Sequence, residues 1–124
     1  MARPVIDHSH VHPSVLEEYS AFHANVIQEV TTAVGRENVV VVGMATNPFV
    51  KRARRLLDAQ GVAHTYLEYG GYTSMWKQRL AIKMWSGWPT FPQVYVQGKL
   101  IGGFKNLEKL VQENKLQALI QAGR

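Results

Sequence analysis

The chain has 124 residues, of which 46% are hydrophobic and 19% charged, as expected of one globular domain with a modest core. It contains no cysteine, so it forms no disulfide, and no apolar run approaches the roughly 20 residues of a membrane span. The net charge of +5 is not gathered in a Lys/Arg run or a nucleic-acid-binding motif, which favours a solvated basic face or a small anionic ligand over nucleic acid.

Residues 1–12 are predicted to form a flexible N-terminal arm. His8, His10 and His12 stand there on alternate positions, and imidazoles can bind metals, but a trio in a polar terminus is too weak a pattern to predict a metal site. The arm lacks the apolar middle of a secretory signal, so a cytoplasmic location is expected. The sequence assigns the three histidines no role.

A long helix is predicted over residues 14–34, because apolar residues recur there at steps of three and four. Ser14 is a suitable N-cap, and Glu17 three residues later completes the pattern of a capping box. Gly35 marks the end of the segment. The apolar positions are Val15, Tyr19, Phe22, Val26, Ile27 and Val30.

Two strands joined by a helix are predicted next. Residues 38–43, NVVVVG, are rich in β-branched side chains, as in a strand buried on both faces. A helix follows from Asn47 to Gly61, and a second strand covers 62–69. Because strands joined by a crossover helix run in the same direction, we expect these two to pair in parallel.

The remaining elements predict a mixed sheet. A hairpin adds an antiparallel pair to the parallel one, which gives four strands with helices on both faces, an α/β fold. These last elements are a helix over 72–85, hairpin strands over 93–103 that turn at Gln97-Gly98, and a helix over 106–120 with a candidate interruption near Asn114.

The segment SGWPTFPQVYVQGKLIGG, residues 86–103, resembles the second half of a glutaredoxin. It is most similar to the monothiol branch, whose members carry W-P-T-x-P-Q before the hairpin and G-G after it. Upstream, NPFV aligns with the family's C-P-Y-C or C-G-F-S, with Asn47 at the nucleophilic cysteine and Val50 at the resolving position. The resemblance covers roughly residues 37–120. It implies a thioredoxin-like three-layer fold, here with an extra N-terminal helix, in one domain over 13–124.

The resemblance implies a site without the family's chemistry. Asn47 is a favourable N-cap and Pro48 suits the first helical position, so a helix N-terminus is expected where the family has its thiolate. Thiol–disulfide exchange needs an attacking thiolate, and the protein's own thiolate ligand of a [2Fe–2S] cluster is missing too. We therefore expect no catalytic residue, no iron–sulfur cluster and no enzyme activity of the family's kind.

The resemblance still implies a groove that binds glutathione or another small anionic thiol ligand. In the family, basic side chains hold the glycine carboxylate, the backbone beside a cis-proline pairs with the cysteine, and amides after the Gly-Gly pair hold the γ-glutamyl end. Arg79 and Lys83 lie one turn apart, which fits an anion clamp and a solvated face equally. Carried over, these roles imply ligand-binding residues Asn47, Phe49, Arg79, Lys83, Thr90, Phe91, Pro92, Gly103, Phe104 and Lys105, with Pro92 in the cis form.

Two departures from the family pattern predict weak glutathione binding. Met44 stands where the family has a basic residue, and Lys105 stands where it has an acidic residue near the ligand's ammonium. Losing or reversing one charge-assisted hydrogen bond costs about 1.5–3 kcal/mol. Lys105 therefore favours a ligand with another carboxylate at that end.

Three functions are compatible with the sequence. The first is a non-catalytic binding module for glutathione, a glutathionylated protein or another anionic ligand. The alternative is a protein–protein interaction domain on the same scaffold with no small-molecule ligand. The third is an enzyme that uses non-thiol chemistry on bound glutathione, but Thr46 is the nearest hydroxyl and no base stands at a suitable spacing. The oligomeric state stays open.

Overall fold

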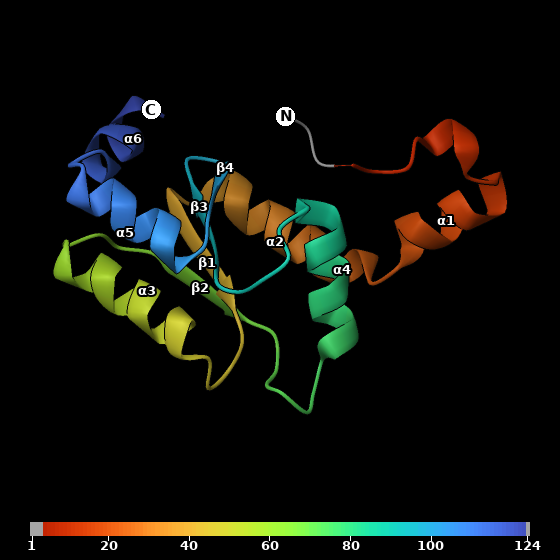
Figure 1. Ribbon diagram of the computed structural model, residues 1–124, viewed down its shortest axis with the longest axis horizontal. Coiled ribbons are helices and arrows are strands. Elements are labelled where there is room, and N and C mark those ends of the chain that lie inside the picture. The colour runs from red at the N-terminus through yellow and green to blue at the C-terminus, as the bar shows by residue number, and fades with distance from the viewer. Residues whose placement is uncertain (1–3, 124) are drawn as a thin grey trace.

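A four-stranded mixed sheet forms the centre of the protein in the computed structural model, which describes residues 4–123 (Figure 1). The strands lie in the order β2-β1-β3-β4, where β1 is parallel to β2 and antiparallel to β3, and β3 and β4 form a hairpin. Val41 pairs with Tyr66 on one side and with Val94 on the other. The predicted sheet is confirmed. Its strands are β1 Val39–Gly43, β2 Thr65–Glu68, β3 Gln93–Val96 and β4 Lys99–Gly102.

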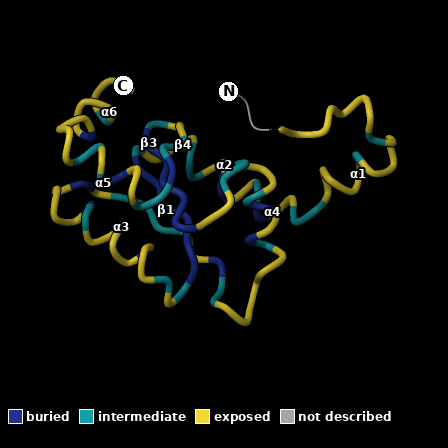
Figure 2. Tube along the Cα trace, viewed as in Figure 1, coloured by how far each residue is buried: buried dark blue, intermediate teal, exposed yellow. Residues whose placement is uncertain are grey.

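Alternate valines of β1 face two separate cores. Val40 and Val42 pack with α2 (Ala24–Arg36) and α4 (Trp76–Ser86). Val39 and Val41 pack instead against the opposite layer, which consists of α3 (Pro48–Ala59), α5 (Phe104–Gln112) and α6 (Leu116–Ala122). Figure 2 shows the two central strands, β1 and β3, as the most deeply buried part of the sheet. A sheet between two helical layers is the predicted architecture.

The predicted single helix over 14–34 is wrong, because the chain forms two helices there. α1 (Pro13–Ala21) ends before His23, whose left-handed backbone, with φ of 47°, separates it from α2. The predicted cap at Ser14 is also wrong: His12 is the N-cap, and its Nδ1 accepts a hydrogen bond from the Ser14 amide at 3.2 Å. No residue of α1 is fully buried, and the helix extends away from the sheet (Figures 1 and 2).

Backbone conformation explains the other boundaries. Met75 is left-handed, with φ of 56°, so α4 begins at Trp76 instead of residue 72. The last predicted helix is two helices, α5 and α6, and the interruption expected at Asn114 is confirmed by its φ of 57°. The hairpin turns at Gln97-Gly98, both with positive φ, as a type I′ turn requires.

The N-terminal arm contains one short 3₁₀ helix, His8–His10, within its described residues 4–12. Residues 1–3 of the predicted arm lie outside the described part. Between residues 4 and 123, none of the helices has the length and apolar character needed to cross a bilayer.

Candidate functional site

A groove of about 530 Å³ collects nine of the ten residues that the sequence proposed for ligand binding. The N-termini of α3 and α5 and the loop that joins α4 to β3 form its walls. Four further residues, Met44, Trp88, Pro89 and Asn106, line it as well. The nine proposed residues are Asn47, Phe49, Lys83, Thr90, Phe91, Pro92, Gly103, Phe104 and Lys105.

Arg79 is the proposed residue that does not line the groove. Its side chain is buried, and Nη1 donates hydrogen bonds to the carbonyl oxygens of Tyr69, at 2.9 Å, and Ser74. The guanidinium therefore fixes the loop between β2 and α4. Of the predicted anion clamp, only Lys83 lines the groove, and it does so from the next turn of α4.

The N-terminus of α3 is closed by its own side chain. Asn47 Oδ1 accepts hydrogen bonds from the amides of Phe49, at 2.9 Å, and Val50, at 3.1 Å, and Pro48 occupies the first helical position. This is the predicted cap. Because the carboxamide oxygen already satisfies two free amides of the first turn, the groove has at this point neither a nucleophile nor an open anion site.

The loop before β3 is held by a chain of buried hydrogen bonds. The Phe91–Pro92 bond is cis, as predicted. Gln93, which is fully buried, donates from Nε2 to the Trp88 carbonyl oxygen at 3.1 Å and accepts at Oε1 from the Tyr95 hydroxyl at 2.9 Å. Burial raises the pKa of Tyr95 to about 12, so its hydroxyl remains a donor at neutral pH. The loop is a fixed wall of the groove.

The N-terminus of α5 remains open to the groove. Gly103 occupies the N-cap position but has no side chain that could accept from the first amides. Asn106 Oδ1 instead accepts from the Gly103 amide at 3.0 Å, which shapes the turn into the helix. Among the described residues, the amides of Phe104 and Lys105 have no acceptor, as is normal for the first turn of an uncapped helix.

Aromatic and basic side chains cover this framework. The rings of Phe49 and Phe104 lie 6.4 Å apart between centroids, and Phe49 keeps 44% of its surface exposed. Lys83 Nζ lies 5.6 Å from the centroid of the Phe91 ring. The lining contains no aspartate or glutamate. The groove therefore has apolar walls and a positive charge.

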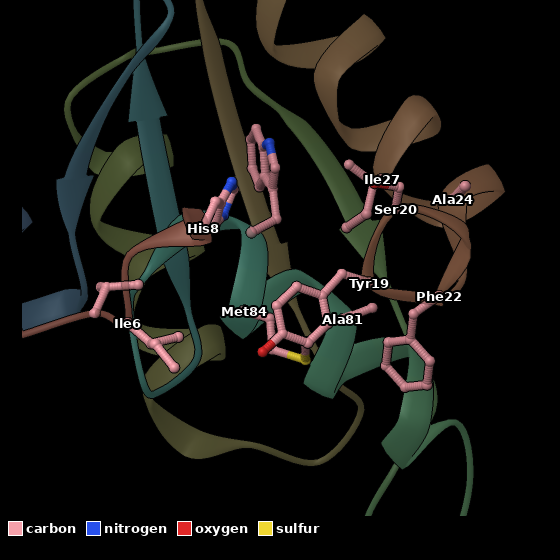
Figure 3. Close-up of a pocket in the computed structure, with 11 residues that line it drawn as sticks. Ile6, His8, Tyr19, Ser20, Phe22, Ala24, Ile27, Ala81 and Met84 are labelled. Carbon is pink, nitrogen blue, oxygen red and sulfur yellow. The ribbon is translucent and has the colours of Figure 1, made fainter. Parts of the chain in front are cut away.

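A second pocket, of about 460 Å³, is lined by the N-terminal arm, α1, the start of α2 and α4, and shares no residue with the groove. Figure 3 shows the Tyr19 ring beside Met84, with Ile6 and His8 of the arm nearby. This pocket was not predicted, because the arm was expected to be flexible; the apolar residues Val5 and Ile6, which line the pocket, were the available signal.

The three histidines of the arm do not converge. His8 lines the second pocket, whereas His12 caps α1. Within residues 4–123 no three side chains of His, Asp or Glu are placed to hold a metal ion together.

Comparison with known proteins gives this arrangement a family. The family model described as Glutaredoxin matches residues 39–101, slightly more than half of the chain. The chain belongs to the glutaredoxin family. It is 52% identical over 95 residues, 77% of either chain, to a "Glutaredoxin-like protein" of Dictyostelium discoideum. It is 33% identical over 73 residues, 59% of this chain and 79% of the other, to a "Probable monothiol glutaredoxin GrlA" of Legionella pneumophila.

A solved structure shows the same fold. The chain of a buckwheat glutaredoxin–glutathione complex superposes with a TM-score of 0.71 at 22% identity, over 86% of this chain and 94% of the other. This glutaredoxin-like protein therefore has the thioredoxin-like three-layer fold expected from its sequence.

The site does not fit an iron–sulfur cluster. The chain offers no thiolate, and Asn47, which the resemblance places at the family's cysteine, has a side-chain oxygen that already accepts from two amides. Thr46, the hydroxyl residue next to Asn47 in the sequence, donates to the Ala45 carbonyl oxygen at 2.6 Å. The arrangement can hold an anion, but no residue in it is prepared for nucleophilic attack.

Proposed function

We propose that this glutaredoxin-like protein is a non-catalytic binding module for a short, peptide-like anion, such as glutathione or the glutathionyl group of a modified protein. The observation that carries the proposal is that one groove collects nine of the ten expected residues, with two lysines and no thiol. The loss of cysteine removes the reaction, whereas the walls that would recognise the ligand remain.

Each wall has a feature that suits part of such a ligand. The backbone of Phe91 beside cis-Pro92 offers peptide groups for strand-like pairing. Lys83 offers a cation for one carboxylate, and the open end of α5 offers amides for another. The buckwheat protein of the same fold has been solved with glutathione, which supports this class of ligand.

The proposal is tested by titration of glutathione and of its disulfide. Trp88 lines the groove, so we expect a saturable change in tryptophan fluorescence at millimolar ligand, with amide shifts in the NMR spectrum at Thr90 and Phe104. Lys83→Gln should weaken binding about tenfold, as expected for the loss of one charge-assisted contact. The matched control is Lys77→Gln on the same helix, outside the groove. If neither the tryptophan fluorescence nor the amide shifts change at millimolar ligand, the proposal is overturned.

A disulfide-reduction assay separates binding from catalysis. The chain has no cysteine, so we expect no turnover above the rate with glutathione alone. Turnover that disappears with Asn47→Ala would show chemistry at the groove and contradict the non-catalytic function.

One observation favours the second candidate, an interaction domain without a small-molecule ligand. α4 exposes a stripe of large apolar side chains at one-turn spacing: Trp76 is 59% exposed, Leu80 40% and Met84 48%. A second copy of the chain is the simplest partner for such a stripe. If so, Leu80→Ser combined with Met84→Ser should abolish self-association in sedimentation experiments, and glutathione should leave the groove resonances unchanged.

A further inference from the structure

The charge of the groove is uncompensated. Lys83 on α4 and Lys105 on α5 both line it, and its lining includes no carboxylate. Within residues 4–123, the ion pairs found join His64 to Asp58 and Lys115 to Glu113, away from both groove lysines. A ligand that enters the groove therefore meets two cations and no carboxylate among the residues that line it.

Several unused donors lie at the α5 end of this groove. The amides of Phe104 and Lys105 have no acceptor among the described residues. The indole Nε1–H of Trp88 is buried and also lacks an acceptor within the described chain. A Cβ on Gly103 would lie only 3.7 Å from that Nε1, so the indole nitrogen lies next to the start of α5. The two amides belong to residues that are not buried and can donate to a ligand in the groove, whereas the indole Nε1 is too deeply buried for a ligand to reach without a shift of the ring.

On the basis of the proposed function, we propose that the groove selects a ligand with a carboxylate but no ammonium group at the α5 end. A carboxylate there receives the free amides and the charge of Lys105. An ammonium beside it, as in a free γ-glutamyl group, meets the Lys105 cation and finds no carboxylate in the lining. The preferred ligand class is thus a short peptide-like dianion with a deaminated or acylated amino end.

The ammonium group of glutathione is expected to be unfavourable in this groove. It carries two carboxylates and one α-ammonium, and that ammonium lies next to the carboxylate that the α5 end would bind. Like charges a few ångström apart at the protein surface weaken binding by about tenfold at low salt. Because the effect is electrostatic, it should shrink as the ionic strength rises.

Three ligands that differ only at this end test the proposal. They are glutathione, glutaryl-cysteinyl-glycine, which lacks the ammonium, and pyroglutamyl-cysteinyl-glycine, which lacks both the ammonium and the carboxylate. We expect the glutaryl peptide to bind about tenfold more tightly than glutathione in titration calorimetry at low salt. The pyroglutamyl peptide should bind more weakly than the glutaryl peptide, because it leaves the α5 amides without a partner.

The charge-reversing variant Lys105→Glu should invert the preference, so that glutathione binds more tightly than the glutaryl peptide. Lys99→Glu is the matched control, because it changes the net charge equally on β4, outside the groove, and should preserve the wild-type order. Equal affinities of the wild type for glutathione and the glutaryl peptide would overturn the inference and leave the proposed function intact. If none of the three peptides binds, the proposed function itself fails, and the inference with it.

Discussion

Two helices, α3 and α5, present their N-termini to the same groove, and the two N-termini are capped differently. α3 is closed: Asn47 Oδ1 binds the amides of Phe49 and Val50. α5 is open: glycine stands at its N-cap, and its first two amides have no acceptor within residues 4–123. In helix termini of this kind, a side-chain cap and an external anion compete for the same donors.

The difference shows which part of the family's site this chain has given up. At α3, where the family resemblance puts a reactive sulfur, the chain has a residue that binds to its own helix. At α5, the donors remain available and Lys105 adds a positive charge. The loss of the thiol is therefore local, and under the proposed function the α5 end is where the anion would bind.

The largest effect is expected from Asn47→Cys, which replaces the N-cap of α3 with a thiol. The amides of Phe49 and Val50 would then stabilise a thiolate, so we expect a thiol pKa near 7 instead of about 8.5. The thiolate should attack glutathione disulfide, form a mixed disulfide and release one glutathione thiol, which mass spectrometry detects. The pKa is read from the ultraviolet absorbance of the thiolate.

Gln112→Cys is the matched control for this variant. It places an exposed thiol at the C-terminal end of α5, where the helix dipole has the opposite sign and should leave the thiol pKa at or above its ordinary value. If both thiols titrate alike, the N-terminus of α3 provides no anion stabilisation, and the comparison with α5 loses its basis.

The second prediction disrupts the turn that leads into the open helix. Gly102 has φ of 116°, and a Cβ there would lie 2.5 Å from Asn106 Cγ, the side chain that binds the Gly103 amide. Gly102→Ala should therefore reduce the free energy of unfolding by about 3 kcal/mol in chemical denaturation, from backbone strain and the clash together. Gly98→Ala, with φ of 80° and no atom within 4 Å of the new Cβ, should cost only about 1 kcal/mol. Equal costs would show that Asn106 does not determine this turn.

The N-termini of α3 and α5 were predicted from different kinds of sequence signal. Asn47-Pro48 before a helical pattern has one local meaning, a capped helix start, and the structure confirms it. The W-P-T-x-P-Q and G-G motif predicted which residues gather at the groove, although these come from segments far apart in the chain. Local signals and a specific motif were sufficient for most of the fold and most of the groove.

Features that depend on tertiary contacts could not be predicted from the sequence. The helical periodicity continues through His23, but the chain breaks there because α2 packs on the sheet while α1 does not. Arg79 stands one turn before Lys83, yet its guanidinium binds carbonyls of a loop whose path no sequence pattern describes. The break at His23 and the position of the Arg79 side chain both depend on parts of the chain that are distant in sequence or irregular in backbone.

The third prediction removes the cap that closes α3. Asn47→Ala frees the amides of Phe49 and Val50 and should lower the free energy of unfolding by about 1 kcal/mol. Asn47→Asp keeps an acceptor at the same place and should remain within about 0.5 kcal/mol of the wild type. Unchanged stability of the alanine variant would mean that water replaces the cap without cost, so that closed and open ends differ little in energy.

The smallest effect comes from closing the open end, and it is the most direct test of the comparison. Gly103 has extended backbone, with φ of −100°, and a Cβ there would make ordinary contacts, 3.5 Å from the Pro92 carbonyl oxygen. The hydroxyl of Gly103→Ser can cap the first turn of α5, which should add about 0.3 kcal/mol of stability.

The same hydroxyl should weaken the binding of carboxylate ligands several-fold, because it takes amides that the ligand would use. Gly35→Ser in α2 also changes a glycine to serine, but away from the groove, and should leave ligand affinity unchanged. Stability and affinity would thus move in opposite directions at Gly103 alone. If Gly103→Ser binds ligands as tightly as the wild type, the α5 amides take no part in recognition, and Lys105 alone distinguishes the two ends of the groove.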